Sequence, residues 1–263
     1  MHSGILIFCR LTKTVCLRAA KRNRTLLAIH PGHRLFVCQC RKNCRCADDT
    51  VALPEKIHLT DPWSYNLCVM PEELIIRNCS PTLAGLKTGS MFSCPYACEQ
   101  SLREEIRTLN RRLAPKGLRI LPLQRKNGRA LIYVFRPHEL ERDLCNRTAL
   151  YLLRRRGYPE TGAASCLCCL VRRFQENREF PHEVGLFLGY PPEDVCAFID
   201  QQAHGCKFVG CWKVYGNEGK VKKTFDLYKK CTRVHCEQWA KGCSIERLTV
   251  TDCTTNLTKK SRT

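Results

Sequence analysis

Regular hydrophobic spacing begins only at about Met70, and this break restricts the predicted fold to the residues after it. Before the break, no acidic residue precedes Asp48, and Arg and Lys are scattered without the period of a helix or a strand. After it, apolar residues recur at the intervals of amphipathic helices and short strands. We therefore expect a basic extension over residues 1–69, one domain over residues 70–255 and a polar tail over residues 256–263.

The extension contains seven of the 21 cysteines, four of them in the string Cys38-Gln-Cys-Arg-Lys-Asn-Cys-Arg-Cys46. A zinc-binding or nucleic-acid-binding arm is one interpretation. The spacing argues against zinc, because structural sites use C-x2-4-C pairs that a longer loop separates. The alternative that we favour is a disordered extension, or one that is never made because translation begins at Met70.

Two strong local patterns define the fold class. Leu102, Ile106, Leu109 and Leu113 share one face of a predicted helix over residues 99–114. Next, apolar runs at residues 118–123 and 130–135 flank an Asn-Gly pair at residues 127–128, which supplies the positive φ angles of a tight hairpin turn.

Further elements are predicted along the chain. The patterns indicate helices over residues 137–156, 163–175 and 192–202, a buried strand over residues 184–188 and a strand over residues 207–215. Asn217 is placed to cap a long helix that carries Val221, Phe225 and Tyr228 on one face. We predict an α+β domain in which several helices cover a mixed or antiparallel sheet, with a hairpin near residues 118–136.

Four strings of the sequence are specific enough to suggest relatives. They are Met70-Pro-Glu-Glu-Leu through Cys79-Ser-Pro-Thr-Leu-Ala-Gly-Leu-Lys-Thr-Gly, Gly117-Leu-Arg-Ile-Leu-Pro-Leu, Pro181-His-Glu-Val-Gly-Leu-Phe-Leu-Gly-Tyr-Pro-Pro-Glu-Asp-Val and Gly210-Cys-Trp-Lys-Val-Tyr-Gly. Together they resemble the family called "domain of unknown function 3793" over about residues 70–252. The resemblance implies a protein of anaerobic bacteria with no assigned activity, and it suggests a flavodoxin as a neighbour of the encoding gene.

The cysteines and the apolar runs indicate the compartment. The early apolar run, Gly4 to Cys9, is shorter than the apolar region of an export signal, and Arg10 and Lys13 come after it instead of preceding it. No run approaches the ~18–20 uncharged residues of a membrane-spanning helix. We therefore expect a cytoplasmic protein with no membrane partner, in which most thiols are reduced and fill the core.

Five residues are candidates for ligand binding. Lys87 lies in Gly85-Leu-Lys-Thr-Gly89, which lacks the second glycine of a phosphate-binding P-loop but could contact an anion. His182-Glu183 resembles the start of a zinc-protease motif, yet position 186 is Leu, so the second ligand is missing. The pair could act as acid and base if both side chains pointed into one pocket, whereas a structural His at the start of a strand is the simpler interpretation. Tyr190 and Lys213 complete the set. We assign no metal site, no cofactor and no catalytic residue.

The positive charge leaves three hypotheses about function. The formal net charge is +20, and residues 70–263 alone contain 33 Lys and Arg against 20 Asp and Glu, with a candidate basic patch at Arg154, Arg155 and Arg156. The first hypothesis is a binding or accessory protein whose basic face docks an acidic partner, such as a flavodoxin-like redox protein. The second is an enzyme acting on a phosphate- or carboxylate-bearing small molecule. The third is non-specific nucleic-acid binding, for which no recognised motif is present.

Overall fold

We describe a computed structural model, which defines residues 26–30, 34–38, 72–96, 98–176 and 179–252. Residues 12–66 form a unit separate from the domain. In that unit, β1 (Leu26–His30) pairs with β2 (Arg34–Cys38) as an antiparallel hairpin, with Leu26 opposite Cys38. The rest of residues 1–69 and the tail over residues 256–263 lie outside the described residues, so our expectations for them stay predictions.

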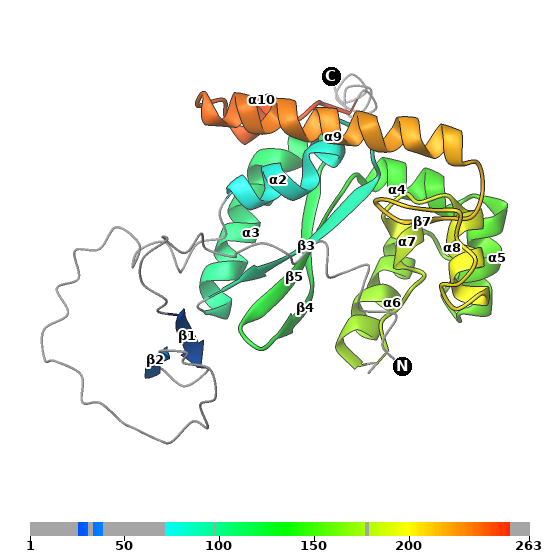
Figure 1. Cartoon of the computed structure of the whole chain (residues 1–263), viewed down its shortest axis with the longest axis horizontal. Coiled ribbons are helices and arrows are strands. Elements are labelled where there is room, and N and C mark those ends of the chain that lie inside the picture. Colours follow the sequence, from blue (N-terminus) through cyan, green and yellow to red (C-terminus); the bar gives the residue numbers. More distant parts are fainter. Residues whose placement is uncertain (1–25, 31–33, 39–71, 97, 177–178, 253–263) are drawn as a thin grey trace, which may run out of the picture. The chain divides into compact units, whose positions relative to one another are not determined.

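The domain is built on a three-stranded antiparallel sheet with the order β3-β5-β4 (Figure 1). Its strands are β3 (Gly89–Pro95), β4 (Arg119–Lys126) and β5 (Arg129–Phe135). The predicted hairpin is confirmed: Asn127 and Gly128 join β4 to β5 with φ angles of 52° and 67°. Such left-handed angles match the twist of the two strands, which is why an Asn-Gly pair stands there.

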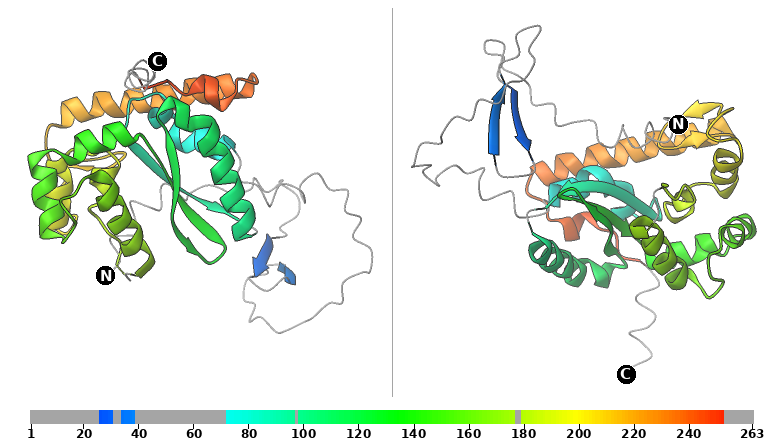
Figure 2. Two further views of the ribbon diagram at one scale, coloured as in Figure 1. Left: turned by 180° about the vertical axis from the view of Figure 1, so that it is seen from behind. Right: turned by 90° about the horizontal axis from the view of Figure 1, so that it is seen from below.

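Both faces of the sheet are buried. Alternate residues of β5 point to opposite sides, and both sets pack against helices. On one face, Ile132 and Val134 pack with α2 (Glu72–Leu83), α3 (Glu99–Leu113) and α10 (Ile245–Leu248). On the other, Leu131 and Tyr133 pack with four helices and one helical turn (Figure 2). These are α4 (Pro137–Leu144), α5 (Arg147–Arg155), α6 (Ala163–Glu176), α7 (Val184–Phe187) and α8 (Pro192–Asp200). The predicted α+β class is confirmed.

A third cluster joins a small hairpin to the long helix α9 (Glu218–Ala240). Strands β6 (Phe208–Val209) and β7 (Lys213–Val214) pair in antiparallel fashion, and Trp212 beside them packs edge-on against Phe225 of α9 at a centroid distance of 4.5 Å. Gly210 permits this approach, since a Cβ there would lie 2.1 Å from the Phe225 ring. As predicted, Asn217 caps α9, its Oδ1 accepting from the Lys220 amide at 3.1 Å.

Three sequence predictions need correction. Residues 184–187 form the buried helical turn α7 and not a strand, because a short run that is apolar on all sides carries no period to distinguish the two. The helix predicted over residues 137–156 is two helices, since Asn146 ends one segment and caps α5 by accepting from the Thr148 amide at 2.8 Å. The strand predicted over residues 207–215 is the β6–β7 hairpin, which turns at Gly210.

The buried guanidinium of Arg136 ties three segments together. Only 2% of the residue is exposed, and it comes directly after β5. Its Nε donates to the carbonyl of Thr82 at 2.8 Å, and its Nη2 donates to those of Leu83 and Val250 at 2.7 and 2.8 Å. Backbone amides also donate to these two carbonyls, Gly85 to Thr82 at 3.2 Å and Val250 to Leu83 at 2.9 Å. Arg136 therefore adds a second, charged donor to each carbonyl and complements the negative end of α2.

We expect Arg136→Met to lower the free energy of unfolding by roughly 2–4 kcal/mol, because the substitution removes several charge-assisted hydrogen bonds at a buried position. Urea unfolding followed by circular dichroism measures this loss. The control is Arg107→Met on the exposed face of α3, which we expect to change stability little. Equal losses in the two variants would contradict the role given to Arg136.

Candidate functional site

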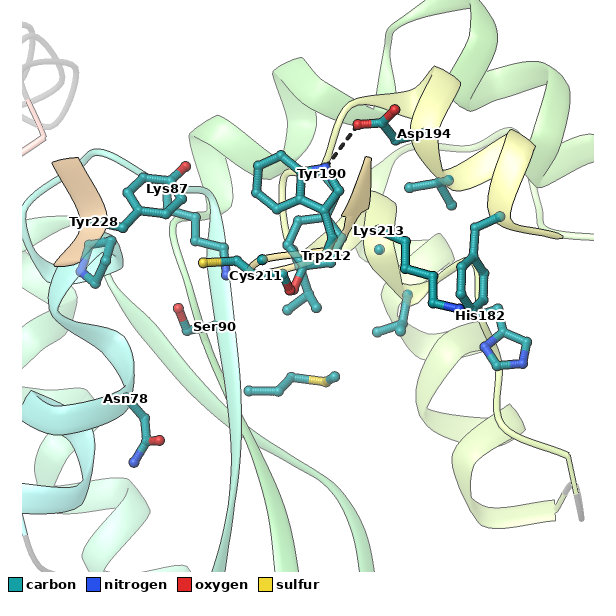
Figure 3. A pocket seen from close by; sticks show the side chains of 18 of the residues that line it. Asn78, Lys87, Ser90, His182, Tyr190, Asp194, Cys211, Trp212, Lys213 and Tyr228 are labelled. Carbon is teal, nitrogen blue, oxygen red and sulfur yellow. Dashed lines mark hydrogen bonds between the residues drawn. The ribbon is translucent and has the colours of Figure 1, made fainter. Parts of the chain in front are cut away.

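A cavity of about 610 Å³ lies between the α2–β3 side of the domain and the segment that runs from residue 180 through the β6–β7 hairpin to α9 (Figure 3). Most of its wall is apolar, including Met91, Val184, Leu188 and Phe198. This volume is in the range of sites that enclose small organic molecules. Four of the five candidate residues line it: Lys87, His182, Tyr190 and Lys213.

Lys87 stands on the loop between α2 and β3, which is the turn beside a strand that the sequence indicated. Its Nζ lies 5.1 Å from the centroid of the Tyr190 ring, a cation–π contact. Although the residue is partly exposed, its ammonium end is deeply surrounded by protein, and this dehydration lowers the pKa of Lys87 to about 8. Within the described residues, Lys87 has no carboxylate partner.

Tyr190 and Trp212 stack at the centre of the wall, with ring centroids 4.7 Å apart. Asp194, at the start of α8, fixes Trp212: its Oδ2 accepts from the indole Nε1 at 2.8 Å. The other oxygen, Oδ1, accepts from the backbone amides of Tyr215 and Gly216 at 2.8 and 2.9 Å. The buried carboxylate of Asp194 is therefore fully used in holding the hairpin and the indole.

The other side of the cavity carries Lys213 and His182 around Phe198. Lys213 Nζ lies 5.8 Å from the Phe198 ring centroid and donates to the Ala203 carbonyl at 2.7 Å. The imidazole of His182 meets the same ring at 5.1 Å in an edge-on arrangement. Burial lowers the pKa of His182, so the ring is neutral at pH 7.

Glu183 lies outside the cavity wall and is 2% exposed. Its Oε1 accepts from the Tyr158 hydroxyl at 3.0 Å and lies 3.5 Å from Nη1 of Arg173. His182 and Glu183 therefore do not point into one pocket as an acid/base pair. The idea that His182 stands at the start of a strand is also wrong, because the residues after it are the turn α7.

Sequence reasoning missed most of the wall, including Asp194, Phe198 and Trp212. The sequence indicates Asp194 only as an acidic residue in the first turn of a helix, where it interacts favourably with the helix dipole. Trp212 was visible only as one aromatic residue in an expected strand. No local pattern indicates that a carboxylate and an indole 18 positions apart are hydrogen-bonded.

The candidate basic patch is largely compensated by acids. Nη2 of Arg154 lies 2.6 Å from Oε2 of Glu160, and Nη1 of Arg155 lies 3.6 Å from Oδ1 of Asp200. Arg156 is exposed, and its carbonyl accepts from Arg173. These pairs reduce the positive potential that Arg154 and Arg155 present to a partner.

The described cysteines are less buried than expected. All thirteen are free, and four of them are buried: Cys79, Cys94, Cys166 and Cys169. In the same part of the chain, no three His, Cys, Asp or Glu side chains gather closely enough to hold a metal ion. None of the helices described here has the length and apolar character needed to cross a membrane.

The comparisons with known proteins give a family and no activity. The chain belongs to the family described as "Protein of unknown function (DUF3793)", whose model matches residues 75–249. The family suggested by the sequence is therefore confirmed. No curated protein and no solved structure matches the chain.

We expect Asp194→Asn to destabilise the domain by roughly 1–3 kcal/mol, because the new amide group faces hydrogen-bond donors. Urea unfolding measures the loss, and faster hydrogen exchange of the Tyr215 and Gly216 amides locates it in the hairpin. The matched control is Glu193→Gln, an exposed acid in the same first turn of α8. If Asp194→Asn exchanged no faster than the control, the carboxylate would not be what holds the hairpin.

Proposed function

We propose that this domain binds a small organic anion with an apolar body in the cavity beside Tyr190 and Trp212. The proposal rests on the charges in the wall: among the described residues, the charged ones that line the cavity are Lys87, Lys213, Lys229, Arg233 and Asp194. The carboxylate of Asp194 already accepts three hydrogen bonds, so its charge is offset by fixed donors.

The two lysines nearest the aromatic rings are the ones that favour an anion. Lys229 and Arg233 each lie near an acid of α9, at 3.8 Å from Asp226 and 3.9 Å from Glu237. Lys87 and Lys213 form no such pair within the described part of the chain. A carboxylate or phosphate would offer both ammonium groups a charged acceptor in a largely apolar setting, where such bonds are strongest.

The geometry supports binding more directly than catalysis. Glu183 is engaged in the core, and the phenols of Tyr190 and Tyr228 both have pKa values raised by burial, to about 12 for Tyr228. These phenols are thus neutral at pH 7 and act as donors or as ring surfaces. A binding protein and an enzyme of this kind would both have to recognise a phosphate- or carboxylate-bearing molecule. The cavity supports that recognition step.

The test compares 2-naphthoate with 2-naphthamide, which has the same body without the charge, by isothermal titration calorimetry. We expect the acid to bind about tenfold more tightly, and Lys87→Met or Lys213→Met to remove most of that preference. Lys230→Met, at an exposed position of α9 that does not line the cavity, is the matched control. Equal affinity for acid and amide, or no binding of either up to 10 mM, would overturn the proposal.

A second candidate is the docking of an acidic protein on the outward face of α9. Lys220, Lys223 and Lys230 share that face with Leu227 and Val234, since these positions recur at helical spacing opposite the buried Val221, Phe225 and Tyr228. Leu227 and Val234 are 47% and 39% exposed. A basic stripe with exposed apolar residues suits an acidic partner, such as a flavodoxin-like redox protein.

If an acidic flavodoxin docks there, Lys223→Glu with Lys230→Glu should slow its association more than it speeds dissociation, and higher salt should have the same effect. Surface plasmon resonance at low and physiological salt measures both rates. Arg107→Glu with Lys126→Glu changes the net charge equally, away from α9, and is the control. Displacement of the flavodoxin by random RNA would instead support nucleic-acid binding.

A further inference from the structure

The cavity has two cationic ends with an aromatic and apolar stretch between them. In Figure 3, Lys87 lies beside Cys211 on the α2–β3 side, whereas Lys213 lies beside His182 on the α7–α8 side. Tyr190 and Trp212 stand between the two lysines. On each of the two opposite walls an ammonium group lies over an aromatic ring, Lys87 over Tyr190 and Lys213 over Phe198.

Each ammonium is held in place before a ligand arrives. Lys213 is oriented by its hydrogen bond to the Ala203 carbonyl, which leaves its other two donors for a ligand. Lys87 has no hydrogen-bond acceptor within the described residues, and the face of Tyr190 sets its position. A ligand that supplies an acid to Lys87 would therefore give this ammonium group the charged acceptor that it lacks within the described residues.

The surface between the two ends suits an apolar segment. The aromatic rings of Tyr190 and Trp212 stand there, and Met91, Val184, Leu188 and Val195 add apolar surface to the same cavity. Both oxygens of Asp194 already accept hydrogen bonds. A polar group in the middle of a ligand would lose its water there without gaining a partner. The chemistry of the wall thus changes along the cavity from cation to apolar surface to cation.

We propose that the ligand is a dianion that carries an acidic group at each end of an apolar body, with one end at Lys87 and the other at Lys213. This inference rests on the proposed binding of an organic anion in the same cavity and adds the number and placement of its acidic groups. Carboxylates and phosphates share the chemistry that both ends require.

The test uses linear dicarboxylates of six, eight, ten and twelve carbons, each against the monocarboxylate of the same length, by calorimetry at pH 6.5. At one or more lengths we expect the diacid to bind at least tenfold more tightly than its monoacid. In Lys87→Met and in Lys213→Met, we expect the diacid to bind no more tightly than the monoacid of the same length. Lys230→Met should retain the gain.

The dependence on pH identifies which end is involved. Cys79 of α2, Cys211 of the hairpin and the Tyr190 ring lie near Lys87. Tyr228 and Lys229 of α9 line the same cavity. Burial raises the pKa of the Cys211 thiol. Because the pKa of free Lys87 is about 8, the diacid gain should shrink as the pH rises from 6.5 to 9.5. Lys87→Arg, which keeps its charge, should flatten that profile.

Three results separate failure of this inference from failure of the proposed function. If monoacids bind in a Lys-dependent manner but no diacid exceeds its monoacid, the cavity binds anions and the two-ended arrangement is wrong. If the gain persists in both Met variants, the second acid contacts another part of the protein, and the inference is likewise overturned. If neither class binds, the proposed function itself fails.

Discussion

The buried Arg136 guanidinium is the contact on which the arrangement of the domain depends. It extends from the residue after β5 and donates to the carbonyls that end α2 and to that of Val250, so that one charge holds the sheet, the helix and the C-terminal segment. The backbone reinforces this junction, because the Val250 amide donates to Leu83 at 2.9 Å and the Arg136 amide to Thr88 at 2.9 Å. A dehydrated charge is costly unless all its donors are used, which makes alternative packings unfavourable.

The same junction determines where Lys87 stands. The chain leaves α2 at the carbonyls bound by Arg136, turns through residues 84–88 and enters β3, so the loop carrying Lys87 is anchored at both ends. On the opposite wall, Asp194 has the corresponding structural role, because it holds Trp212 and the end of β7 near Lys213. Two buried charges, one of each sign, thus position the two sides of the cavity. Neither is free to meet a ligand, and that leaves recognition to the lysines and the rings.

Positive charge alone is a poor guide to the site on this protein. The three consecutive arginines are the most conspicuous basic cluster in the sequence, yet two of them face Glu160 and Asp200. Lys87 and Lys213 are isolated in the sequence, and they are the cations that meet the cavity without a carboxylate partner in the described residues. The charge that remains after ion pairing is therefore the better guide to the site, and only the folded structure shows which charges are paired.

The amino-acid sequence by itself determined the elements whose signals are local: the Asn127-Gly128 hairpin, the amphipathic α3, the Asn217-capped α9, the α+β class and the family. It also named four of the residues that line the cavity. Only the tertiary structure decided that residues 184–187 form a helical turn, that Glu183 faces the core, and that Asp194 holds Trp212. The reason is physical: turn chemistry and helical period act between neighbours in sequence, whereas a cavity wall and a saturated carboxylate arise from contacts between segments far apart in the chain.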